Sequence, residues 1–139
     1  MNYLLGIDVG TSGTKTVLFD TAGGVMSSAT YEYTMQQPQN GWAEQNPEDW
    51  WKAVRLGVVQ VLRDSGIHAS DIRGIGISGQ MHSLVMLDEN NRVLRPAILW
   101  CDGRTTAECD EIHQRVGKER LIELTANPAL TGFTAGKIL

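Results

Sequence analysis

Residues 3–34, YLLGIDVGTSGTKTVLFDTAGGVMSSATYEYT, decide the fold. The run from Tyr3 to Val9 is short, apolar and followed by a glycine-rich turn, which predicts a buried strand leading into a loop. A second strand is expected at 14–19 and a third at 25–34, because the turn-forming sequence DTAGG separates them. The chain therefore opens as a three-stranded antiparallel meander.

The segments after the meander predict a helix and further strands. Asn46 and Pro47 are a typical cap and first residue of a helix. Apolar side chains then recur on one helical face, at Trp50, Val54, Val58, Val61 and Leu62. Later strands are expected at 72–79, 84–87 and 96–100, and a polar helix at about 105–116. The fold class is α/β, and the hairpins exclude a purely parallel sheet.

Length and composition favour one domain, or a large part of one, with a moderate core. The 139 residues are 42% hydrophobic, and 12 basic residues stand against 16 acidic ones without a basic cluster. We therefore expect neither a nucleic-acid partner nor a membrane partner, since no apolar run approaches the roughly 20 residues that span a bilayer. With only two cysteines, both read as reduced, the expected location is cytoplasmic.

The loop GIDVGTSGTK combines a carboxylate with groups that bind phosphate. Asp8 ends the first strand and could hold a hydrated Mg²⁺ against a polyphosphate. Glycine-rich turns expose backbone amides to anions, hydroxyls add donors and a lysine adds charge. The candidate phosphate-binding residues are Gly10, Thr11, Ser12, Gly13, Thr14 and Lys15. The alternative is an ordinary hairpin with Asp8 as a turn former. A Walker A loop is excluded, because Thr14 precedes Lys15 and a strand follows.

Two further clusters could bind a polyhydroxylated ligand. The small-residue strand in GISGQMHSL delivers Gln80, Met81 and His82 to a turn, where His82 could orient a hydroxyl group. The alternative is a turn histidine satisfied by backbone groups. The segment RPAILWCDGRT ends with Trp100, Asp102 and Arg104, which could hold a sugar between an aromatic face and charged groups. Equally, Asp102 and Arg104 could form an ion pair that caps the following helix.

Together these motifs resemble the first part of the FGGY family of carbohydrate kinases, and within it the xylulokinase branch. The loop DVGTSGTK is shared with wider actin-type relatives, whereas GQMH followed by LRPAILWCDGRT is more specific. The resemblance covers essentially the whole chain, in order and spacing. It implies a ribonuclease-H-like, actin-type ATPase lobe, with residues 1–139 as the amino-terminal part of the first kinase domain and therefore an incomplete domain.

The resemblance also implies an activity and roles for the candidate residues. The family transfers the terminal phosphoryl group of ATP to a sugar hydroxyl, and the xylulokinase branch converts D-xylulose to D-xylulose 5-phosphate with Mg²⁺. Asp8 would face the metal, through water, and the phosphates; the turn at 11–13 would approach the transferred phosphoryl group. Met81 and His82 would belong to the sugar pocket. Two alternative functions stay open: a non-catalytic sugar- or phosphate-binding module, and a kinase for gluconate or another pentulose. A homodimer is also possible.

Three residues depart from the xylulokinase pattern, in which Gly, Asn and Pro usually stand at the positions of Ser83, Cys101 and Gly136. Ser83 matters most, since the sequence MHS is similar to gluconate kinases of the same family. These kinases are also several times longer, and by resemblance their later portion carries the aspartate that acts as general base. We therefore expect residues 1–139 alone to be inactive.

Overall fold

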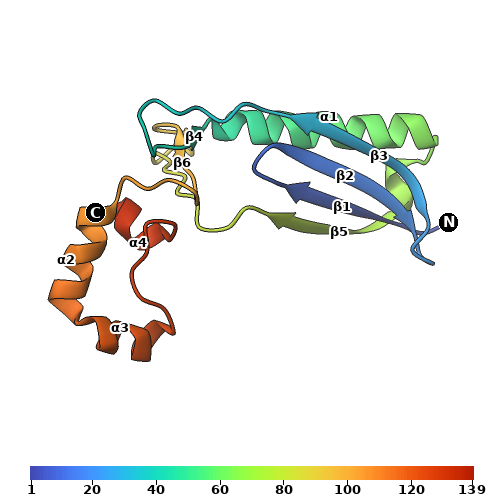
Figure 1. The fold of residues 1–139 in the computed structure, drawn as a ribbon. Coiled ribbons are helices and arrows are strands. Elements are labelled where there is room, and N and C mark those ends of the chain that lie inside the picture. Colours follow the sequence, from blue (N-terminus) through green and yellow to red (C-terminus); the bar gives the residue numbers. More distant parts are fainter. The chain divides into compact units, whose positions relative to one another are not determined.

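The computed structural model describes residues 1–139, which form two compact units (Figure 1). The first, here called the sheet unit, comprises Met1–Thr34 and Glu48–Gln80. The second, the helical unit, comprises Met35–Pro47 and Met81–Leu139.

The regular elements divide between these units in chain order. The sheet unit holds β1 (Tyr3–Val9), β2 (Gly13–Asp20), β3 (Val25–Glu32), nearly all of α1 (Pro47–Ser65), the short 3-10 helix η1 (Ala69–Asp71) and β5 (Ile72–Gly79). The helical unit holds β4 (Glu44–Gln45), β6 (Ala97–Ile98), α2 (Thr106–Val116), α3 (Lys118–Thr125) and α4 (Thr134–Ile138).

A four-stranded mixed sheet in the order β3-β2-β1-β5 is the frame of the sheet unit. The first three strands form the predicted antiparallel meander, and β5 adds to β1 in parallel. The strands predicted at 3–9 and 72–79 are confirmed, and the third strand ends at Glu32, two residues before the predicted boundary. The mixed α/β class expected from the hairpins is therefore confirmed.

The core of this unit lies between the sheet and α1, which runs beside the strands in Figure 1. The helix begins at Pro47 as predicted, and Val61 is fully buried in the same cluster as Leu5 and Leu18. The helix approaches the sheet closely at Gly57, where an added Cβ would lie 2.4 Å from the Thr16 Oγ1. Only glycine fits there, because any larger side chain would overlap a fully buried residue of β2.

Two predicted strands of the helical unit are shorter in the structure or absent. The segment 84–87 makes only isolated bridges, because Leu84 pairs with Ile98 whereas Leu87 pairs with Val93. A strand needs consecutive residues on one partner, and this segment changes partner after one residue. The strand predicted at 96–100 is reduced to β6, because the chain turns back when the Asp102 amide bonds the Leu99 carbonyl.

The carboxyl-terminal part of the helical unit is built from short helices. The polar helix predicted at 105–116 is confirmed as α2, whereas α3 and α4 were not predicted. The helices α2 and α4 pack closely, since a Cβ on Gly136 would lie 3.1 Å from the Thr105 Oγ1 and 3.3 Å from the Cys109 Sγ. None of the helices has both the length and the apolar character that a bilayer span requires.

Candidate functional site

Asp8 and Lys15 lie side by side on the face of the sheet opposite α1. They are register partners on β1 and β2, and Ser78 on β5 is the other neighbour of Asp8. Because alternate residues of a strand point to opposite faces, the burial of Ile7 against α1 directs Asp8 away from the core. These side chains line an open concavity of about 350 Å³. It therefore brings a carboxylate, an ammonium group and a hydroxyl to one surface.

The turn between β1 and β2 adjoins this surface, and three of its carbonyl groups accept hydrogen bonds from donors within the protein. The Gly10 amide donates to the Gly13 carbonyl at 3.0 Å, and the Tyr33 amide donates to the Ser12 carbonyl at 3.2 Å. The Tyr33 hydroxyl donates to the Gly10 carbonyl at 2.6 Å. Carbonyl oxygens repel anions, so internal bonding of three of them suits a turn that binds phosphate.

Gly13 has a separate structural reason to be glycine. An added Cβ would lie 2.8 Å from the Tyr31 carbonyl oxygen and 3.1 Å from the Glu32 Cα on the adjacent strand. The close packing of β2 on β3 at this point leaves no room for a side chain. The turn is thus held against the end of β3, which keeps its backbone in one position.

Two predicted site residues have other environments than expected. The side chain of Thr14 is fully buried and its Oγ1 lies 3.3 Å from the Tyr33 hydroxyl, so it contacts the protein interior and not the concavity. Gln80, predicted with the sugar-binding turn, belongs to the sheet unit. Its amide donates to the Val9 carbonyl at 2.9 Å, and its Nε2 donates to the Gly10 carbonyl at 3.4 Å.

Met81 and His82 lie in the helical unit, where His82 adopts a positive φ of 65°. This left-handed conformation is uncommon for a residue with a side chain, and the surrounding bonds maintain it. The His82 carbonyl accepts hydrogen bonds from the Lys137 Nζ at 3.0 Å and the Thr134 Oγ1 at 3.1 Å. Its ring tilts against Phe133 at a centroid distance of 4.8 Å. The 70% exposed side chain of Met81 is accessible at the same turn.

An apolar cavity of about 270 Å³ adjoins His82 and Phe133. Leu121 from α3 and Ile112 from α2 line it as well. His82 is thus placed at the edge of a hollow between short helices, within the helical unit.

Lys137 was not among the predicted site residues, although it has a well-defined role in placing His82. Its side chain is buried, and its Nζ donates to both the His82 and the Gly132 carbonyls, the latter at 2.8 Å. Burial lowers the pKa of Lys137, and the negative charge of Asp102 opposes that shift. The only signal in the sequence was a lysine between Gly136 and Ile138 in a largely apolar segment.

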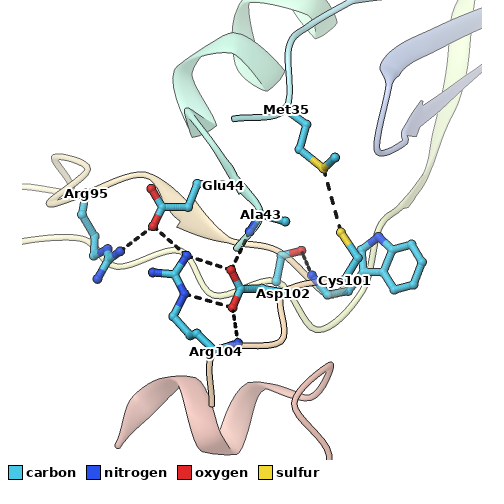
Figure 2. A network of polar contacts seen from close by, with 9 residues as sticks. Met35, Ala43, Glu44, Arg95, Cys101, Asp102 and Arg104 are labelled. Atoms are coloured by element: carbon cyan, nitrogen blue, oxygen red, sulfur yellow. Dashed lines mark hydrogen bonds and ion pairs between the residues drawn. The ribbon is translucent and has the colours of Figure 1, made fainter. Parts of the chain in front are cut away.

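Asp102 and Arg104 form a buried ion pair, one of the two alternatives derived from the sequence (Figure 2). The Arg104 Nε and Nη2 donate to the two Asp102 carboxylate oxygens at 2.9 and 2.7 Å, and the Ala43 amide donates to Asp102 at 2.6 Å. The same guanidinium also pairs with Glu44 at 2.8 Å and stacks 3.6 Å from the Trp42 ring centroid. The ion pair of the two alternatives is therefore present, and a sugar contact from Asp102 or Arg104 stays a prediction.

The pair does not cap α2, so the capping role that was expected together with the ion pair is wrong. The helix begins at Thr106, its cap residue is Thr105, and no side chain bonds its first amides. Burial raises the pKa of the Asp102 carboxyl, but the hydrogen bonds from Arg104 and the Ala43 amide outweigh it, and the pKa lies below its ordinary value. The network instead joins the segment around Glu44 to the loop after β6.

Trp100 stands at the start of that loop and is 47% exposed. Its amide donates to the Ser83 Oγ at 3.2 Å, so the serine that departs from the xylulokinase pattern holds the backbone of a candidate sugar-binding residue. Ser83 directly follows His82, so the Trp100 backbone is bonded next to that turn. The half-exposed indole of Trp100 is suited to stacking on a sugar ring. Of the three residues predicted in this segment, Trp100 is the most exposed, whereas Asp102 is buried and the Arg104 side chain is 12% exposed.

Comparison with known proteins identifies the family of this chain. The model of the FGGY family of carbohydrate kinases, N-terminal domain, matches residues 3–139. The chain belongs to the FGGY family. It is 47% identical over its whole length to a xylulose kinase of Lactococcus lactis, of which it covers 28%. The chain thus spans little more than a quarter of this FGGY relative.

Solved FGGY structures share the fold. A xyloylose kinase from Brucella ovis superimposes with a TM-score of 0.91 at 39% identity, over 99% of this chain and 28% of that one. A gluconate kinase from Lactobacillus acidophilus gives a TM-score of 0.78 at 30% identity, over 88% of this chain and 24% of that one. The expected kinase-type α/β fold is therefore confirmed.

Proposed function

We propose that the protein to which this chain belongs phosphorylates a sugar hydroxyl with ATP, and that its substrate is D-xylulose, giving D-xylulose 5-phosphate. The observation that carries the proposal is the concavity of Asp8, Lys15 and Ser78 beside a turn whose carbonyls are bonded internally. The similarity to xylulose kinases over the whole chain supports the choice of sugar.

Each group of the sheet unit has a role in this proposal. Lys15 would neutralise charge on the polyphosphate of ATP, and the amides of the turn at 11–13 would bind its terminal oxygens. Asp8 would hold Mg²⁺ through water, since carboxylate oxygens suit this ion, and the bound ion supplies further charge neutralisation. The carboxylate of Asp8 and the hydroxyl of Ser78 suit that ion, because they offer oxygen atoms on one accessible face of the sheet. Asp8 is not assigned as the general base.

The helical unit would supply the sugar contacts. His82 would donate or accept a hydrogen bond with a sugar hydroxyl, Met81 would contact its carbon skeleton and Trp100 would stack on it. In this proposal the residues 1–139 are part of the first of two kinase domains, and by themselves they bind ligands without turnover.

The test is an assay of the full-length gene product with MgATP and separate acceptors: D-xylulose, a second pentulose, gluconate and glycerol. We expect kcat/KM to be highest for D-xylulose. A preference for gluconate would replace the substrate while keeping the reaction class. No phosphoryl transfer to any acceptor, together with calorimetric binding of a sugar, would establish the non-catalytic module instead.

A further inference from the structure

Tyr33 contacts the turn between β1 and β2 at two points. It directly follows β3, whose last residue is Glu32. Its backbone amide donates to the Ser12 carbonyl at 3.2 Å, and its hydroxyl donates to the Gly10 carbonyl at 2.6 Å. A single residue therefore binds both ends of the turn that the proposed function assigns to phosphate.

These two bonds fix the direction of two peptide planes. A peptide unit is planar and trans, so the carbonyl of one residue and the amide of the next point in opposite directions. Holding the Gly10 carbonyl therefore directs the Thr11 amide away from Tyr33, and holding the Ser12 carbonyl does the same for the Gly13 amide. Glycine permits many backbone conformations, and these contacts reduce that freedom at Gly10.

The hydroxyl of Tyr33 is itself oriented by its surroundings. A phenol has one proton, and the short bond to the Gly10 carbonyl uses it, so the buried Thr14 hydroxyl at 3.3 Å is the donor to Tyr33. Burial raises the pKa of Tyr33, the Thr14 bond opposes the shift and the charge of Asp8 adds to it. The phenol thus stays a neutral donor across the physiological range.

We propose that Tyr33 is a positioning residue for phosphate binding: its hydroxyl and amide hold the carbonyls of Gly10 and Ser12 so that the following amides are presented to the polyphosphate of ATP. The inference rests on the proposed function of this turn. Tyr33 belongs to none of the sequence motifs, and its hydroxyl connects the buried Thr14 side chain to the turn.

The chain offers a matched control. Tyr31 lies on β3, two residues before Tyr33, and its hydroxyl donates to the Gln60 Oε1 on α1 at 2.6 Å, a bond as short as that of Tyr33. Tyr33→Phe and Tyr31→Phe each delete one phenolic oxygen in the sheet unit. Only the first deletes a bond to the turn. Comparing them separates positioning from a general loss of stability.

In the full-length gene product we expect Tyr33→Phe to raise the KM for MgATP by roughly three- to tenfold, the range for one lost hydrogen bond. The KM for the sugar and the melting temperature should match those of Tyr31→Phe. An equal MgATP KM in the two variants would overturn the inference while leaving the proposed function intact.

A second measurement keeps the inference testable if the wild-type protein transfers no phosphoryl group. Amide shifts of Thr11 and Gly13 would be followed by NMR during titration with MgATP and with inorganic pyrophosphate. Saturable shifts that weaken in Tyr33→Phe but not in Tyr31→Phe support the inference independently of catalysis. Wild-type amides that do not respond to either ligand would overturn it.

Discussion

The two units of this chain are stabilised by different means. The sheet unit has regular strands of seven or eight residues, and its core is a cluster of apolar side chains between the sheet and α1. The helical unit has two-residue strands, and it contains a largely buried ionic network in which Asp102 and Glu44 share Arg104. Apolar burial tolerates small changes, whereas a buried charge that loses its partner is strongly destabilising. The two units should therefore respond differently to substitution.

The largest effect is expected from Asp102→Ala, which leaves the Arg104 guanidinium, only 12% exposed, without its bidentate partner. We expect the free energy of unfolding to fall by about 3–5 kcal/mol. Hydrogen exchange should show the loss in the helical unit first, with the amides of β1 and β2 still protected. Protection lost equally in both units would mean that the contrast between them is wrong.

The same carboxylate predicts a pH dependence. Because its folded pKa lies below the ordinary value of about 3.9, its stabilising contribution is complete above that value and is lost as the pH falls through the folded pKa. Denaturant titrations of wild type between pH 5 and pH 2 should show a decline that is shallower in Asp102→Asn. Identical slopes in the two proteins would exclude this carboxylate as the source.

Asp8→Ala should reduce kcat of the full-length gene product by roughly a hundredfold or more, because it removes charge placement at the phosphates. The KM for the sugar should change little, since the proposed sugar contacts lie in the helical unit. Asp64→Ala, which removes an exposed carboxylate of α1, is the control. Turnover equal in the two variants would remove Asp8 from the site.

Gly57→Ala tests the close contact of α1 with β2. The added methyl group would lie 2.4 Å from the Thr16 Oγ1, and we expect a loss of about 1–3 kcal/mol from overpacking. Gly76→Ala is the matched control, because no atom lies within 4 Å of its added Cβ, and it should change stability by less than about 0.5 kcal/mol. Thermal denaturation of both variants measures this difference in stability. If the Gly57→Ala variant were as stable as the Gly76→Ala variant, the helix would be able to shift away from β2.

His82→Ala should raise the sugar KM by roughly tenfold, equivalent to about 1.4 kcal/mol, with the KM for MgATP unchanged. The reason is the loss of one hydrogen bond to the sugar, while Lys137 and Thr134 still hold the backbone carbonyl at this position. His68→Ala is the control, since His68 is an exposed residue of the sheet unit. Sugar kinetics identical in both variants would make His82 a purely structural turn residue.

The smallest effect is expected from Arg95→Ala. Arg95 pairs with Glu44 at 2.8 Å, but its side chain is 40% exposed, and Glu44 keeps Arg104 as a partner. We expect less than about 1 kcal/mol, decreasing as salt is added. Urea denaturation at low and high ionic strength checks this. A loss as large as that of Asp102→Ala would show that the exposed arm of the network is as important as the buried one.

Elements with a local signal were predictable from the sequence. The meander follows from the short apolar run at 3–9 and the glycine-rich turns after it, and α1 follows from Asn46, Pro47 and the spacing of Val54, Val58 and Val61. The position of Asp8 beside Lys15 follows from the hairpin itself, because antiparallel neighbours joined by a short turn have a fixed register.

Contacts between distant segments were not predictable in this way. The ion pair of Asp102 with Arg104 is local, but the bond from the Ala43 amide crosses 59 residues and the bond from Gln80 to the Gly10 carbonyl crosses 70. Neither separation has a periodic signal. The strand predicted at 84–87 was wrong for the same reason, since its pairing depends on which distant residue each position meets.

The sequence by itself determined the α/β class, the antiparallel opening, the first long helix and the carboxylate-plus-glycine loop, because each depends on residues close together in the chain. Only the tertiary structure decided that Thr14 is buried, that Asp102 and Arg104 bind each other within a larger network, and that Tyr33 holds the turn after Asp8. These outcomes depend on which groups packing brings within hydrogen-bond distance, and the free energy of that packing is shared among segments far apart in the chain.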